Sequence, residues 1–232
     1  KLAYKNLMAH RMRSALTLIG IVIGISAVVF LVAFGFGIQR LVTEQITGAD
    51  AFQLIDVGTG NSKVVRLDLE MLSKVRSIPG VKSVEVTANL AGKAKRDGSE
   101  MDVSFFAMTG NYLDWSGRKI RYGVTLSDEN NDRKVVVNNA YLDFLGDKKD
   151  QEYLGEKVYF NIIVPKELSP DGQAHTYEDQ EYTISGIVRE DAPPSVYTNM
   201  SNIASFNIPV YSQAKIRVED RNKVDTIRKQ AE

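Results

Sequence analysis

The chain has 232 residues, and its 29 basic and 29 acidic residues leave no formal net charge. A balanced charge argues against a nucleic-acid-binding surface or a highly acidic partner. The absence of cysteine excludes disulfides, thiol chemistry and cysteine-ligated zinc, and a hydrophobic content of 44% argues against disorder.

The first 13 residues are basic and amphipathic. Lys5, Arg11 and Arg13 are among their cations, and the first acidic residue of the chain is Glu44. Apolar residues recur at four-residue spacing, at Tyr4, Met8 and Met12. This spacing predicts an interfacial helix over residues 1–13, with Lys5, Arg11 and Arg13 anchoring it at the cytoplasmic surface. The alternative is a positively charged flank that only sets topology.

Residues 14–40 predict a transmembrane helix, because no charge lies between Arg13 and Arg40. The apolar part spans roughly 30 Å as a helix, which matches the bilayer core. A cleaved signal peptide has an apolar core of about 7–15 residues and a small-residue cleavage site, and this stretch fits neither requirement. The preceding cations place the amino terminus in the cytoplasm and residues 50–232 outside.

Gly20 and Gly24 form a G-x-x-x-G pair within this span. Two glycines one turn apart let another helix backbone approach closely, so the pair predicts a helix-packing contact. The chain supplies no second uncharged run of this length. We therefore expect either dimerisation through this helix or a longer membrane protein with further transmembrane helices beyond residue 232.

The outer part reads as mixed helices and strands, an α+β fold. Residues 41–49 predict a helical extension of the span, with Glu44, Gln45 and Ile46 at the junction to the outer domain. Asp68 is a candidate cap for a helix over residues 69–78. The other predicted elements of the first half are a strand at 52–57 and a hairpin of strands 81–88 and 101–108, joined by a turn at 95–99.

The second half predicts a further unit. Its elements are strands at 134–138, 157–164 and 181–189, a short helix at 139–145, a polar arm at 165–180, an exposed mobile loop at 192–207, a strand at 215–219 and a final helix at 223–230. The loop prediction rests on Pro193-Pro194 and on the serine and asparagine residues that follow.

The order of several short motifs resembles the amino-terminal half of a MacB/FtsX-type permease, the membrane subunit of mechanotransmission-class ABC transporters. The motifs are Leu2-Ala3-Tyr4-Lys5-Asn6-Leu7, Arg13-Ser14-Ala15-Leu16-Thr17-Leu18-Ile19-Gly20-Ile21-Val22-Ile23-Gly24, Ile78-Pro79-Gly80-Val81, Lys134-Val135-Val136-Val137, Leu154-Gly155-Glu156-Lys157-Val158, Tyr182-Thr183-Ile184-Ser185-Gly186-Ile187-Val188 and Ile208-Pro209-Val210-Tyr211. The similarity covers nearly the whole chain.

This resemblance implies a Porter-like subdomain at residues 50–110 and 208–232 and a Sabre-like subdomain at 111–207. It implies a bacterial cytoplasmic (inner) membrane location, a second permease copy or paralogue, and an ABC ATPase subunit or domain that binds ATP and Mg. It also implies that an adaptor or another envelope protein is a candidate partner, beside the lipid bilayer.

No nucleotide-binding loop or catalytic constellation occurs in the chain, so we expect no enzyme activity, no cofactor and no metal here. Three functions stay open. In the first, which the resemblance implies, the chain belongs to a transporter that carries ATP-driven motion outward to export or extract an envelope-associated substrate. Alternatively, it belongs to a non-transporting signalling permease that activates an envelope partner such as a cell-wall hydrolase, or it is a single-span anchored receptor or assembly protein.

Overall fold

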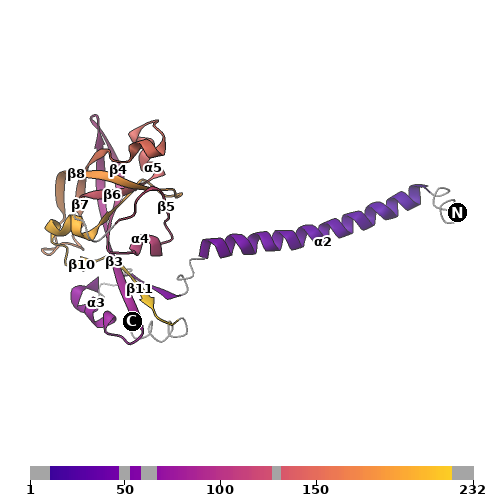
Figure 1. The fold of residues 1–232 in the computed structure, drawn as a ribbon, viewed down its shortest axis with the longest axis horizontal. Helices are drawn as coiled ribbons and strands as arrows, with labels where there is room; N and C mark the ends of the chain where they lie inside the picture. Colours follow the sequence, from indigo (N-terminus) through magenta and orange to yellow (C-terminus); the bar gives the residue numbers. More distant parts are fainter. Residues whose placement is uncertain (1–10, 47–52, 59–66, 127–131, 221–232) are drawn as a thin grey trace. The chain divides into compact units, whose positions relative to one another are not determined.

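The computed structural model describes residues 11–46, 53–58, 67–126 and 132–220 (Figure 1). The chain divides into two compact units, residues 1–48 and 49–232. Most of the predicted interfacial helix at 1–13 and all of the predicted helix at 223–230 lie outside the described residues.

The described residues of the first unit form one helix, α2, which runs from Arg11 to Ile46. The predicted span at 14–40 lies within it, and helical backbone continues through residues 41–46. Arg11 and Arg13 belong to the first turn of this same helix rather than to a separate one. Residues 47–49 of the predicted extension lie outside the described part.

The second unit is organised on one long strand, β3, from Val81 to Arg96. Its first half pairs with β11 (Gln213–Val218), which in turn pairs with β1 (Leu54–Gly58). Its second half pairs with β4 (Ser99–Met108) on one side and with β7 (Lys157–Val164) on the other. One strand therefore belongs to two different pieces of sheet.

Around the second half of β3 the strands close into a ring. The pairing runs from β3 to β4, to β9 (Ser195–Asn199), to β6 (Lys134–Asn138), to β8 (His175–Val188), to β7 and back to β3. The β4–β9 and β6–β8 pairs are parallel, and the other four are antiparallel. The edge strand β5 (Ile120–Gly123) pairs with β8 outside the ring.

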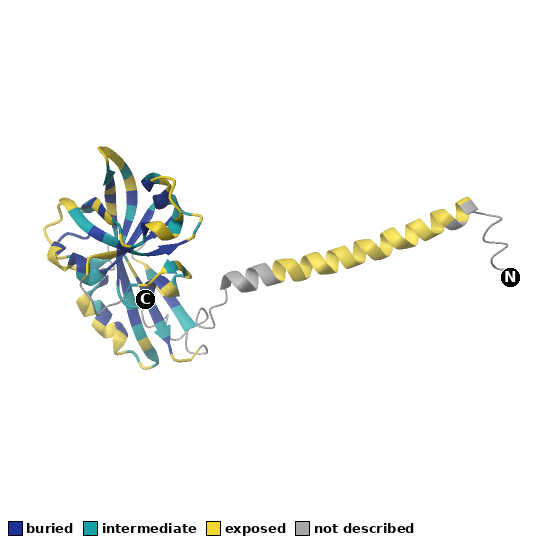
Figure 2. Cartoon of the chain, turned by 45° about the horizontal axis from the view of Figure 1, so that its top comes forward, coloured by how far each residue is buried: buried dark blue, intermediate teal, exposed yellow. Residues whose placement is uncertain are grey.

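The ring encloses the main hydrophobic core, because one buried cluster receives side chains from all six of its strands. Phe105, Phe160 and Tyr182 contact one another there, with ring centroids 5.5 to 6.0 Å apart. The short helices α5 (Asn139–Leu145) and η3 (Met200–Phe206) add further side chains to the cluster. Figure 2 shows the alternation of buried and exposed residues that this closure produces along the strands.

A second core lies between the first half of β3, its neighbours β1 and β11, and helix α3 (Leu69–Arg76). Leu72 and Val75 are the buried residues of α3. As predicted, Asp68 caps this helix, accepting a hydrogen bond from the Met71 amide at 2.8 Å. The two-stranded pair of β2 (Leu67–Asp68) and β10 (Val210–Tyr211) joins the same region. The described residues of this unit also include the short helices α4 (Tyr112–Trp115) and η2 (Asp150–Tyr153).

Several locally determined elements agree with the sequence-based expectation. β6, α5 and β7 have the predicted bounds. The β3–β4 hairpin turns at Asp97 and Gly98, both with positive φ, as a tight hairpin turn of this type requires. β3 is eight residues longer than predicted, and within it a Cβ on Gly92 would lie 3.0 Å from the Val103 side chain, so glycine permits the close strand approach there.

The predicted mobile loop at 192–207 is wrong. Residues 195–199 form β9, which is buried along its whole length between β4 and β6. Its polar side chains are also satisfied: Thr198 donates to the carbonyl of Lys134 on β6 at 2.8 Å, and Asn202 donates to Thr198 at 2.9 Å. The distant partners β4 and β6 thus turn a polar, proline-led segment into a central strand.

The predicted polar arm at 165–180 is also shorter than expected. Residues 175–180 begin β8, and His175 pairs opposite Val164 of β7. The Porter-like and Sabre-like boundaries stay a prediction. The sheet crosses them without interruption, since β9 of the expected Sabre-like part pairs with β4 of the expected Porter-like part.

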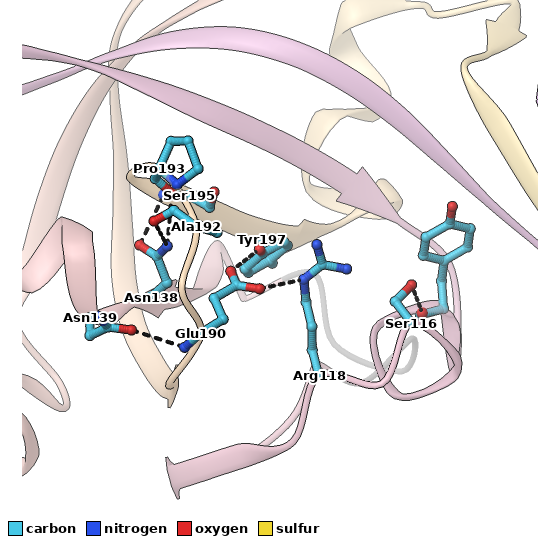
Figure 3. A network of polar contacts seen from close by, with 10 residues as sticks. Ser116, Arg118, Asn138, Asn139, Glu190, Ala192, Pro193, Ser195 and Tyr197 are labelled. Atoms are coloured by element: carbon cyan, nitrogen blue, oxygen red, sulfur yellow. Dashed lines mark hydrogen bonds and ion pairs between the residues drawn. The ribbon is translucent and has the colours of Figure 1, made fainter. Parts of the chain in front are cut away.

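Asn138 joins α5 to β9 through a single buried amide. Its Oδ1 accepts from the Ser195 amide at 3.0 Å and its Nδ2 donates to the Pro193 carbonyl at 2.8 Å (Figure 3). The same Oδ1 also accepts from the Tyr141 amide at 3.0 Å. We expect Asn138→Ala to lower the free energy of unfolding by about 3 kcal/mol, because it removes a helix cap and leaves buried groups unpaired.

Denaturant titration of the purified chain measures this change. The matched control is Asn161→Ala, which removes one exposed hydrogen bond to the Asp179 amide and should cost less than about 1 kcal/mol. Equal losses in the two variants would show that Asn138 has no special structural role.

Candidate functional site

Helix α2 carries the predicted site residues of the membrane segment. Residues 15–39 form the one helix of the described chain that is long and apolar enough to cross a bilayer. Its large apolar side chains are exposed along the whole length, from Leu16 to Ile38. Figure 2 shows this exposure. An apolar surface of this kind is stable in lipid or against other helices, not in water.

Gly20 and Gly24 lie one turn apart on α2. A Cβ built on either glycine would meet nothing within 4 Å, so this part of the helix surface is open to a neighbouring backbone. The described chain places no helix against them. The packing role of the two glycines therefore stays a prediction.

The structure places the other predicted residues at the two ends of α2. Arg11 and Arg13 lie in its first turn, and Glu44, Gln45 and Ile46 form its last residues. Lys5 lies outside the described residues. The helix therefore separates the predicted anchoring cations from the predicted junction, and their roles stay predictions.

The outer unit contains a hollow that the sequence did not reveal. Its volume is about 440 Å³, and it lies on the outer face of the sheet where β1, β11, β3, β4 and β9 run side by side. The lining residues include Asn89, Phe106, Tyr112, Arg118, Gln213 and Lys215. The lining residues come from six segments that are spread from residue 56 to residue 215.

An ion pair and a buried phenol form one wall of this hollow. Arg118 Nε lies 2.9 Å from Glu190 Oε2, and the Tyr197 hydroxyl donates to the other oxygen of the same carboxylate (Figure 3). Glu190 is itself positioned by its amide, which donates to Asn139 Oδ1 at 2.9 Å. The Arg118 guanidinium lies 5.2 Å from the centre of the Tyr197 ring.

These contacts fix the protonation states of the wall. Burial, and then the hydrogen bond to Glu190, raise the pKa of Tyr197 to about 12. Burial alone would lower the pKa of Arg118, but Tyr197 and Glu190 outweigh it and the net shift is upward. At neutral pH the phenol is therefore neutral and the guanidinium is charged.

The opposite wall is built in a similar way. The Tyr112 hydroxyl donates to Gln213 Oε1 at 3.1 Å, and the Lys215 ammonium lies 5.7 Å from the centre of the Tyr112 ring. Lys215 also pairs with Asp56 at 2.5 Å. Burial, followed by the charge of Asp56, raises the pKa of Tyr112 to about 12. Each cation of the hollow thus has a carboxylate partner, an arrangement suited to binding rather than to proton transfer.

Sequence reasoning missed this hollow because its residues meet only through strand register. In the sequence, the polar Thr87 and Asn89 alternate with the apolar Ala88 and Leu90, which places the polar pair on the opposite face of the strand. No local pattern links that pair to α4 or to β11. Among the described residues, no three histidine or acidic side chains gather as a metal site.

Comparisons with known proteins give a consistent picture. A family model described as the MacB-like periplasmic core domain matches residues 14–232. A macrolide export ATP-binding/permease protein MacB of Campylobacter jejuni is 30% identical over 96% of this chain and 33% of its own length. An uncharacterised ABC transporter permease, YknZ of Bacillus subtilis, is 23% identical over all of this chain and 58% of its own length.

Solved structures share the fold. The periplasmic region of MacB from Actinobacillus actinomycetemcomitans matches with a TM-score of 0.59 at 12% identity, over 80% of this chain and 85% of that one. The extracellular domain of the YknZ transporter from Gram-positive bacteria matches with a TM-score of 0.56 at 16% identity, over 77% and 88%. The chain thus spans a third of the Campylobacter relative and nearly all of these outer domains.

Proposed function

The chain belongs to the MacB-like periplasmic core domain family, and from this membership we propose that it is part of an ABC transporter permease that carries ATP-driven motion outward. The motion originates on an ATPase subunit or domain that binds ATP and Mg. The outer unit then acts on an envelope-associated substrate for export or extraction. The chain itself performs no chemistry in this proposal.

The observation that carries the proposal is the continuity of α2. It extends beyond the apolar segment 15–39 through Ile46 without a break in helical backbone. A helix transmits displacement because its backbone is stiff, whereas a flexible linker absorbs it. Residues 40–46 would thus carry movement of the span toward the outer unit.

Within the outer unit, β3 supplies a second stiff element. Its 16 residues extend over about 50 Å, with strand partners along almost the whole length and on both edges at residues 91–95. The second core, which packs against α3 and is called the α3 core below, lies on the first half of β3. The main core inside the closed ring of strands, called the barrel core, lies mainly on its second half. A displacement of one core would therefore move the other core by a similar distance.

The proposal includes a location and partners. The span lies in a bacterial cytoplasmic membrane with residues 50–232 outside, and the cations before it favour this orientation. A second permease copy or paralogue packs against the open face of Gly20 and Gly24. An adaptor or another envelope protein would receive the motion.

Substitutions at the junction residues 44–46 test whether transport requires a stiff helix there. We expect replacement of Glu44, Gln45 and Ile46 by three glycines to abolish transport in the full-length complex while ATP hydrolysis continues. Each glycine costs the helix about 1 kcal/mol, which breaks its stiffness. Transport by membrane vesicles and phosphate release measure the two activities.

The control for the junction test is three alanines at the same positions, which remove the side chains but keep the helix. The alanine variant should transport normally. Full transport by the glycine variant, or equal failure of both variants, would contradict the proposal that a stiff helix α2 carries the motion outward. Activation of an envelope enzyme without any transport would identify a signalling permease instead.

The glycine pair generates a second prediction. We expect Gly20→Leu or Gly24→Leu to weaken permease assembly, because a side chain holds the neighbouring backbone away. Gly37→Leu is the matched control, since about 100° of rotation per residue places it on another side of the helix. Cross-linking in membranes measures assembly, and equal assembly of all three variants would show that the pair is ordinary helix surface.

Orientation is tested by labelling. The chain has no cysteine, so single cysteines can be added without background from this region. In a cysteine-free full-length protein, Gln173→Cys at an exposed position should react with an impermeant maleimide in spheroplasts. Lys5→Cys should react only after lysis. The reverse pattern would overturn the proposed topology.

A further inference from the structure

We propose that the hydroxyl groups of Thr109 and Ser212 hold the α3 core and the barrel core together as one rigid body. Both side chains are positioning residues, because each completes the backbone hydrogen bonding of β3 at the point where one core ends and the other begins. The inference deepens the proposed function and rests on it for the effect on transport. The rigid connection itself can be measured without transport.

The strand partners of β3 change at residues 86–89, which we call the waist of the strand. On one edge, β11 pairs with β3 as far as Thr87, and β7 begins to pair at Ala91. On the opposite edge, the pairing with β4 begins at Thr87. Among the described residues, no strand therefore covers the first edge at residues 88–90.

The buried face of β3 passes from one core to the other at the same place. Val86 belongs to the α3 core, and Ala88 belongs to the barrel core. Because side chains alternate between the two faces of a strand, these two residues are neighbours on the buried face. Bending of β3 at the waist would therefore let the two cores move separately.

A serine hydroxyl bridges the gap on the first edge. Ser212 directly precedes β11, and its amide donates to the Thr87 carbonyl at 2.9 Å. Its Oγ accepts from the Asn89 amide at 2.9 Å. Amides of alternate residues point to the same edge of a strand, so Asn89 is the residue between Thr87 and Ala91 whose amide needs an acceptor there. The hydroxyl takes the place of a strand carbonyl.

A threonine hydroxyl does the same on the edge of β4. Thr109 directly follows β4, and its amide donates to the Val86 carbonyl at 3.0 Å. Its Oγ1 accepts from the Val86 amide at 2.9 Å. The hydroxyl donates its own proton to Glu85 Oε2 at 2.7 Å, which fixes its orientation. A Cβ on Gly110 would collide with the Glu85 carboxylate, so glycine permits this close approach.

The two contacts, which we call the hydroxyl bridges, cross the boundary between the cores in opposite directions. Thr109 extends a barrel strand and binds Val86 of the α3 core. Ser212 extends a strand of the α3 core and binds Asn89 on the barrel half of β3. Without the hydroxyls, two half-buried amides would lose their acceptors, which favours a distorted and more mobile waist.

The distance between the two cores tests the proposal directly. The chain has no cysteine, so spin labels can be attached to a cysteine-free full-length protein at Ser73→Cys on α3 and Thr176→Cys on β8, which are both exposed. Pulsed electron paramagnetic resonance in detergent micelles measures the distribution of distances between the labels. We expect one narrow distribution with both hydroxyls present. Thr109→Val combined with Ser212→Ala should broaden it about twofold, because the waist can then bend.

Two control variants separate the hydroxyl bridges from general weakening. Thr109→Ser combined with Ser212→Thr keeps both hydroxyls and should keep the distribution narrow. Thr183→Val combined with Ser185→Ala removes the same two hydroxyl types from half-buried positions on β8 and should also leave it narrow. Circular dichroism confirms that each variant is folded. If the bridge variant does not fold, each of its single substitutions should still broaden the distribution to a smaller extent.

The outcomes are distinct. An unchanged distribution in the bridge variants, or equal broadening in the β8 control, would overturn the proposal. In the full-length complex, the bridge variant should lose transport and keep ATP hydrolysis, whereas the variant that keeps both hydroxyls should retain both activities. Broadening together with full transport would overturn the positioning role. The substitutions at residues 44–46 test the proposed function separately, since they leave both hydroxyl bridges intact.

Discussion

The outer unit depends on the pairing of β3 along both of its halves. Val84 and Val86 enter the α3 core, and Ala88 and Leu90, on the same face, enter the barrel core. The two cores therefore share one hydrogen-bonded strand rather than a linker. Because strand pairs are rigid across their bonds, the register of β3 sets the position of every neighbouring element, including the two walls of the hollow.

Elements whose signals are local could be predicted from the sequence. The Asp68 cap defines the start of α3, and Asp97-Gly98 defines the β3–β4 turn. A valine run followed by Asn138 defines β6 and the start of α5. In each case the deciding contact joins residues a few positions apart, so composition and spacing carry the information. The apolar part of α2 was likewise predicted from a local signal, the uncharged stretch between Arg13 and Arg40.

The remaining features depend on contacts between distant residues. β9 contains polar residues and follows two prolines, and it becomes a strand because β4 and β6 satisfy its backbone on both sides. The hollow needs Asn89, Phe106 and Tyr197 in one register, together with Arg118 held by Glu190. None of these pairings leaves a short-range pattern, so the hollow could not be predicted from the sequence. The fold class could be predicted because it follows from the local signals of the individual helices and strands.

Closure of the barrel also constrains the order of folding. The last ring strand to be synthesised is β9, and it must enter between β4 and β6, with Ser195 opposite Ser104. Until then the growing chain presents two unpaired strand edges, and closing such a long loop is entropically slow. An unpaired edge readily recruits strands of other chains. The nascent outer unit is therefore most vulnerable to aggregation in the interval before residue 199 has emerged.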